Sequence, residues 1–114
     1  MNTRKVGNKL EDYVLSELNS VTNNYFTKTP NSGAVFGEPD LTNSNWLVEC
    51  KSKQTSKNFN ILDKEVKKIQ KSCTLTGKDW LLVTQNSDNK IIVSLELDIF
   101  LELFKNHEIQ KRSR

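Results

Sequence analysis

The sequence predicts a single α/β domain with a mixed central β-sheet flanked by helices, in the element order α-β-β-β-α-β-β-α. In two segments the apolar residues recur every three or four positions, which is the period of one helix face. Between and after these segments lie short apolar runs or alternating stretches that are typical of strands. The chain has 114 residues, of which 35% are hydrophobic and 27% are charged, as expected of one globular domain. We expect this domain to span residues 1–110 and a basic tail to occupy residues 111–114.

The first helix is predicted by an apolar stripe near the start of the chain. Its members are Val6, Leu10, Val14, Leu18 and Val21. Asn23 and Asn24 should end the helix, because asparagine favours caps and turns over helix interiors. A short strand is expected at residues 25–27. The turn-forming residues 30–33 separate it from a second short strand at residues 34–36.

The longest predicted strand covers residues 45–52 and shows a clean alternation of side chains. One face carries Trp46, Val48 and Cys50, and the other carries Leu47, Glu49 and Lys51. The second face therefore begins apolar and ends with two charged groups.

A lysine-rich second helix follows, and Gly77 is suited to its end. Its expected buried stripe consists of Leu62, Val66, Ile69 and Cys73. A continuous apolar run at residues 80–84 predicts a buried strand. A turn at residues 87–90 leads to another strand at residues 91–93, and a last helix is expected at residues 97–105.

Positive charge is concentrated in the middle of the chain. The formal net charge is +3, but residues 51–78 carry eight lysines against two acids, a local excess of +6. Such a patch suits a polyanionic partner. A solvated lysine-rich helix would look the same, so charge alone does not decide between the two.

Asp40, Glu49 and Lys51 form the candidate catalytic constellation. On an extended strand Glu49 and Lys51 project from the same face about 7 Å apart. If Asp40 lies on or just before the neighbouring strand, its carboxylate can reach Glu49. Two such carboxylates, with the backbone carbonyl of Cys50 as a further ligand, would suit Mg²⁺ or Mn²⁺. Taken separately, these residues could equally be an ordinary strand with an exposed Glu-Lys pair.

Phosphodiester hydrolysis would explain a lysine beside two metal-binding carboxylates. A bound metal lowers the pKa of a water molecule and neutralises charge on the phosphate. Lys51 could orient or deprotonate that water, or stabilise the transition state. His107, the only histidine, lies far along the chain in a polar segment, so a histidine base is an unattractive alternative.

Pro39-Asp40, followed after eight residues by Glu49-Cys50-Lys51, resembles the motif of the PD-(D/E)XK nucleases. Arg4-Lys5, Gly7 and Glu11 are similar to the opening of archaeal-type and phage Holliday junction resolvases, and Ser32-Gly33 follows in the same order. The likeness covers about residues 4–84. It implies a restriction-endonuclease-like core and cleavage of branched DNA by a homodimer. The apolar segment 91–104, or the basic helix, would contribute to the dimer face.

The resemblance also implies roles for individual residues. Glu11 matches a metal-binding glutamate of the first helix, and Ser32 matches a serine near the active site. Gly7 would allow a close approach. Basic side chains on both flanks would hold DNA phosphates without reading bases: Arg4, Lys5, Lys9, Lys53, Lys57 and Lys64.

Several broader expectations accompany this interpretation. No apolar run approaches the roughly 20 residues that span a bilayer, and no signal peptide is evident, so a cytoplasmic protein without a membrane partner is expected. Cys50 and Cys73 should be reduced thiols in the core, and the tryptophans and later phenylalanines should also be core. Thirteen asparagines and fourteen lysines suggest an AT-rich genome, and the compact size would suit a phage protein located in the host cytoplasm. Alternatives are another structure-specific or single-strand nuclease, a non-catalytic DNA-binding module, and a small structural protein.

Overall fold

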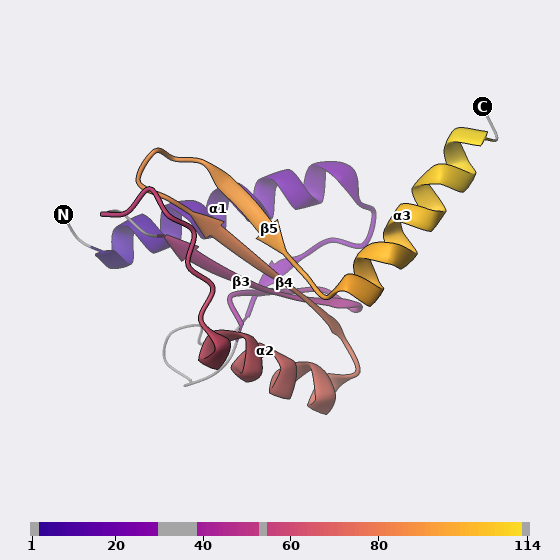
Figure 1. Cartoon of the computed structure of the whole chain (residues 1–114), viewed down its shortest axis with the longest axis horizontal. Coiled ribbons are helices and arrows are strands. Elements are labelled where there is room, and N and C mark those ends of the chain that lie inside the picture. Colours follow the sequence, from indigo (N-terminus) through magenta and orange to yellow (C-terminus); the bar gives the residue numbers. More distant parts are fainter. Residues whose placement is uncertain (1–2, 30–38, 53–54, 113–114) are drawn as a thin grey trace.

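The computed structural model describes residues 3–29, 39–52 and 55–112, which form a five-stranded sheet and three helices (Figure 1). The elements in chain order are α1 (Thr3–Val21), β1 (Thr27–Lys28), β2 (Leu41–Thr42), β3 (Trp46–Ser52), α2 (Asp63–Thr76), β4 (Asp79–Gln85), β5 (Ile91–Ser94) and α3 (Leu97–Arg112). The predicted order of helices and strands is therefore confirmed.

The strands lie in the order β1-β2-β3-β4-β5, so each strand pairs with its neighbours in sequence. Only β3 and β4 run parallel, and the other pairs are antiparallel. Parallel neighbours need a crossover connection, which α2 supplies. The sheet is mixed, as the sequence predicts.

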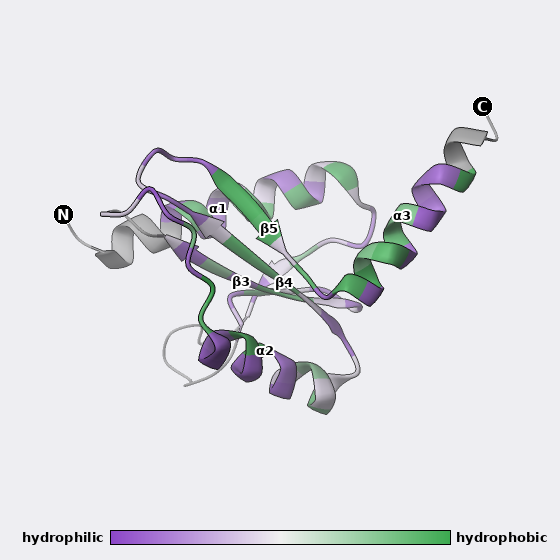
Figure 2. Ribbon diagram, viewed as in Figure 1, coloured by the Kyte–Doolittle hydropathy of each residue, from purple (hydrophilic) through white to green (hydrophobic). Residues whose placement is uncertain are grey.

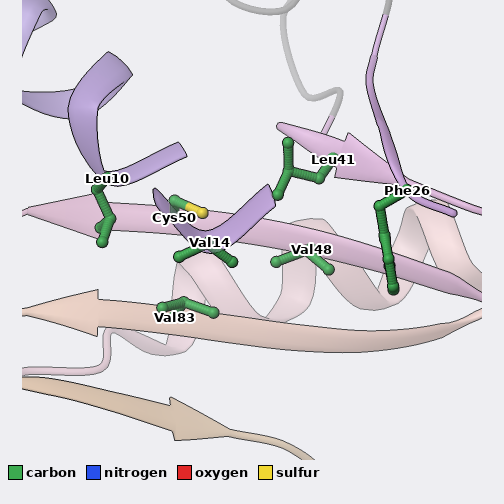
Figure 3. Packing of buried hydrophobic residues seen from close by; sticks show 7 residues of the cluster. All are labelled: Leu10, Val14, Phe26, Leu41, Val48, Cys50 and Val83. Atoms are coloured by element: carbon green, nitrogen blue, oxygen red, sulfur yellow. The ribbon is translucent and has the colours of Figure 1, made fainter. Parts of the chain in front are cut away.

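The main core lies between α1 and one face of the sheet (Figure 3). Its buried members are Leu10, Val14, Phe26, Leu41, Val48, Cys50 and Val83. Val48 and Leu41 have no exposed surface at all and are partners in the β2–β3 register. The predicted inward face of β3 therefore packs against the apolar stripe of α1.

A smaller core lies on the other face, where Ile69 of α2 packs against Trp80 and Leu82 of β4. Val66 and Cys73 join this cluster, but Leu62 is 42% exposed. The inclusion of Leu62 in the buried stripe is therefore wrong, because this residue stands at the N-cap before the first turn of α2.

The end of α2 follows the expected pattern. Gly77 adopts a left-handed conformation with φ of 73°, and its N–H donates a 2.7 Å hydrogen bond to the carbonyl of Cys73. Glycine reaches this conformation without steric cost. The helix can therefore stop and turn directly into β4.

Several sequence predictions need correction. The first strand lies two residues later than expected, with Phe26 buried in front of it and Tyr25 exposed. Val21 is 81% exposed because it is the last residue of α1 and lies beyond the buried part of the stripe. Phe100 and Phe104 are also about half exposed, so their assignment to the core is wrong. The strand expected at residues 34–36 lies outside the described residues.

The last helix is longer than predicted and protrudes from the rest of the molecule (Figure 1). It continues seven residues past the expected end at Lys105 and includes the first two residues of the predicted tail. The radius of gyration is 14.8 Å, whereas a compact chain of this length has one of about 13 Å. The protruding helix accounts for the elongated shape. None of the helices in the described ranges is both long and apolar enough to cross a membrane.

Candidate active site

Asp40 lies at the edge of β3, immediately before β2 begins at Leu41. Its Oδ2 atom accepts a 2.8 Å hydrogen bond from the backbone N–H of Cys50. Its own carbonyl accepts a 3.0 Å bond from the N–H of Thr29, which follows β1. The backbone and side chain of Asp40 are thus held by the strands on either side, and the predicted position at a strand entry is confirmed.

Three carboxyl groups meet at this edge. Asp40 is within hydrogen-bonding reach of the side chains of both Glu11 and Glu49. Glu11 comes from α1 on one face of the sheet, and Glu49 lies on the β3 face toward α2. Because β2 is only two residues long, no strand in the described part of the chain pairs with this edge of β3 where these groups approach one another.

The carboxyl groups strongly perturb one another. Burial, the hydrogen bond with Asp40 and its negative charge raise the pKa of Glu49 to about 9. The same causes in the same order raise the pKa of Glu11 to about 7. Both shifts have the same direction, because the surroundings disfavour the ionised form of each glutamate. Strongly perturbed carboxyls gathered at one place are typical of functional sites.

Two lysines face the same site. Lys51 shares the β3 face with Glu49, and its charge lowers the pKa of that carboxyl. Lys68 of α2 acts in the same direction on Glu49. Lys68 belongs to no motif in the sequence. Its position directly before buried Ile69 was the one signal that it borders the sheet.

The backbone N–H of Cys50 donates its hydrogen bond to Asp40, and the thiol lies in the core, as predicted. In a strand the N–H and C=O of one residue point toward the same edge, so the Cys50 carbonyl faces the side where Asp40 lies. Burial, followed by the nearby carboxylates, raises the pKa of the Cys50 thiol. Both Cys50 and Cys73 are free thiols, although Cys73 is only partly buried.

The donor set fits a divalent cation chemically. Within the described ranges, no group of three or more His, Cys, Asp or Glu side chains is arranged to hold a metal ion. Mg²⁺ does not require such a group, because it commonly takes one or two carboxylates and keeps several waters. Asp40, Glu49 and the Cys50 carbonyl supply oxygen ligands at one edge, with Glu11 beside them. A cation there would relieve the repulsion that raises the glutamate pKa values.

The structure describes only some of the predicted DNA-contacting residues. Lys9 on α1, Lys57 after β3 and Lys64 on α2 are exposed. The Lys57 carbonyl accepts a 2.9 Å hydrogen bond from the buried side chain of Asn86, which ties this loop to the end of β4. Ser32 and Lys53 lie outside the described residues, as do the side chains of Arg4 and Lys5 and the surroundings of Gly7.

The fold is similar to that of a solved Holliday junction resolvase, Hjc from the archaeal hyperthermophile Archaeoglobus fulgidus. The likeness has a TM-score of 0.60 at 16% sequence identity, and covers 76% of this chain and 73% of that chain. No family model matches the chain, and no curated protein matches it. At this identity the comparison establishes the fold. This chain therefore has a resolvase-like α/β core with a mixed sheet between helices.

Proposed function

We propose that this chain is a metal-dependent endodeoxyribonuclease, and specifically a Holliday junction resolvase that cuts branched DNA as a homodimer. The observation that carries the proposal is the convergence of Asp40, Glu49 and Glu11 at one edge of β3, beside Lys51. The similarity to a resolvase fold supports the same conclusion. A fold alone does not determine a substrate, so the choice of branched DNA rests on this likeness and on the motif.

Each site residue has a chemical role in this proposal. Asp40, Glu49 and the Cys50 carbonyl would hold Mg²⁺ or Mn²⁺, with Glu11 as a fourth ligand. The metal would activate a water molecule and neutralise charge on the scissile phosphate. The Lys51 ammonium would orient the water and stabilise the negative charge of the transition state. Ser32 stays a proposed participant on the basis of the motif.

DNA would approach across the edge that carries Asp40 and over the basic surface of α2. Lys9, Lys57 and Lys64 are exposed on three different segments, and Arg4, Lys5 and Lys53 belong to the same proposed set. Contacts of this kind position the duplex and carry no base information. Binding should therefore depend on DNA shape and weaken steeply with salt.

A substrate panel tests the proposal. Labelled four-way junction, flap, single-stranded and linear duplex DNA are incubated with the protein in Mg²⁺ or in EDTA. We expect paired symmetric nicks in the junction, lost in EDTA. Preferential cutting of the flap or single strand would instead indicate another structure-specific nuclease. Binding without cutting in both Mg²⁺ and Mn²⁺ would indicate a non-catalytic DNA-binding module.

The Asp40→Asn variant links cleavage to this site. Asparagine retains an oxygen that can accept the hydrogen bond from Cys50 but removes the charge, so the fold should persist while cutting falls at least 100-fold. Asp79→Asn is a matched control. Asp79 is exposed and begins β4, whereas the β4 residue that pairs with Lys51 lies near the other end of that strand. Equal cleavage by Asp40→Asn and the wild type would reject the proposed site.

A further inference from the structure

The helix α3 exposes an apolar face that nothing in the described part of the chain covers. Leu97, Phe100, Leu101 and Phe104 recur at intervals of three and four, and each is between 46% and 67% exposed. The rings of Phe100 and Phe104 stack on each other with centroids 5.8 Å apart. The first half of the helix is distinctly hydrophobic in Figure 2. A soluble helix ordinarily buries such a stripe.

The base of α3 is anchored in a way that directs the helix outward. Glu96, the residue before α3, accepts a 3.0 Å hydrogen bond from the indole N–H of Trp80 and a 3.1 Å bond from the side-chain amide of Gln70. The Glu96 carbonyl also accepts a hydrogen bond from the backbone N–H of Phe100. These bonds tie the first turn to α2 and β4. The helix then extends away from the sheet (Figure 1) and makes no substantial packing contact with another described element.

An apolar groove lies on the α1 side of the sheet, between α1 and the strands β4 and β5. Its wider part, of about 450 Å³, is lined by residues that include Tyr13, Val21 and Val93. A second hollow of about 440 Å³ shares Leu18, Val21 and Leu81 with the first and reaches Leu103 of α3. The exposed helix and the groove therefore border each other and form one apolar surface.

The size of this surface matches what a stable dimer needs. A large apolar side chain carries roughly 150–200 Å² of surface, so the five exposed apolar residues in the first half of α3 present about 400–500 Å². Those residues are Leu97, Phe100, Leu101, Leu103 and Phe104. The exposed fractions of Tyr13, Val21 and Val93 add about 300 Å² on the same basis. A standard interface buries about 800 Å² on each partner.

We propose that the occupant of this surface is a second copy of the chain, with α3 of each copy lying in the α1–β5 groove of the other. One chain supplies both the protruding apolar helix and the apolar groove, so a twofold axis can satisfy both at once. This inference deepens the proposed function, since a symmetric pair would present two active sites to one junction. The contact itself rests on the apolar surface and does not depend on catalysis.

Sedimentation equilibrium of the wild type and two matched variants tests the interface. We expect a dimer at micromolar concentration, and Leu101→Glu on α3 should raise the dimer dissociation constant at least 100-fold. Leu75→Glu is the control, because Leu75 is an exposed leucine of α2 outside this surface, and it should leave the constant unchanged. Circular dichroism checks that both variants keep their helices. A monomeric wild type, or a dimer that tolerates Leu101→Glu, would overturn the inference.

Disulfide trapping tests whether α3 of one copy lies in the α1–β5 groove of the other copy. Chains carrying Cys73→Ser are prepared with either Leu101→Cys on α3 or Val21→Cys in the groove. We expect rapid oxidative cross-linking in the mixture of the two, and little in either protein alone. Cross-linking of Leu101→Cys with itself would show that two α3 helices pair directly, and would overturn the groove as the docking site.

The two proposals can fail separately. A monomer that still cleaves DNA in Mg²⁺ would reject this interface and leave the nuclease proposal standing. A dimer with the expected cross-links that cleaves none of the DNA substrates would retain the interface and reject the nuclease proposal.

Discussion

Replacing Glu49 by glutamine should change how the stability of the metal-free protein depends on pH. The pKa of Glu49 is raised from 4.5 to about 9, chiefly by burial and then by Asp40. Between these two values the folded state holds a proton that the unfolded state has released. The stabilisation from this proton is complete below the unfolded pKa and is lost as the pH rises toward the folded pKa. Glutamine resembles the protonated carboxyl and does not titrate.

The size of the effect follows from proton linkage. One group that is protonated only in the folded state lowers the free energy of unfolding by up to about 1.4 kcal/mol per pH unit. From pH 6 to pH 8 the wild type should therefore lose about 2–3 kcal/mol relative to Glu49→Gln. Glu49→Gln should already be more stable than the wild type at pH 6, and the difference should widen as the pH rises to 8.

Urea denaturation in EDTA at pH 6, 7 and 8 measures this difference. Glu102→Gln on exposed α3 is the control, and should run parallel to the wild type. Adding Mg²⁺ should restore stability to the wild type at pH 8, by about 2.7 kcal/mol at a hundredfold excess over its dissociation constant. The variant should gain less. Parallel curves for Glu49→Gln and the wild type in EDTA would refute this account of Glu49.

Three further predictions concern the fold and the site. Asn86→Ala removes two bonds accepted from backbone N–H groups and one donated to a carbonyl; urea denaturation should show a loss of about 2–4 kcal/mol. Leu41→Ala empties a fully buried position and should cost about 2–5 kcal/mol in the same assay, unless the site collapses. Lys68→Gln should raise the pKa of Glu49 in an NMR titration, because the Lys68 charge lowers it. Lys67→Gln, at an exposed position paired with Asp63, should leave that pKa unchanged.

The raised glutamate pKa values and the proposed metal have the same physical origin. Carboxyls crowded together in a partly buried place repel each other when ionised, and a cation in their midst reverses that cost. The affinity of the site for metal should therefore increase with pH, because Mg²⁺ must compete with protons for Glu11 and Glu49. Isothermal titration with Mg²⁺ at pH 6 and pH 8 would measure this, and equal affinities would contradict it.

Local patterns were sufficient to predict most of the architecture. The stripe on α1 and the alternation of β3 depend on the geometry of one element, and both are confirmed by the burial of Leu10, Val14 and Val48. The left-handed cap at Gly77 is equally local. The ends of elements were predicted less well, as Val21 and Leu62 show, because a residue of an apolar stripe is buried only where the opposing layer extends far enough to cover it.

The sequence by itself placed Glu49 and Lys51 on one face of a strand, and placed Asp40 before the neighbouring strand. It did not determine that Asp40 would bind the Cys50 N–H and approach carboxyls from opposite sides of the sheet. That arrangement depends on where the short β2 stops. Similarly, periodicity predicted an apolar last helix, but only the tertiary structure decided that the helix projects from the sheet. Periodicity identifies which face of an element is apolar, whereas the packing of other elements decides whether that face is covered.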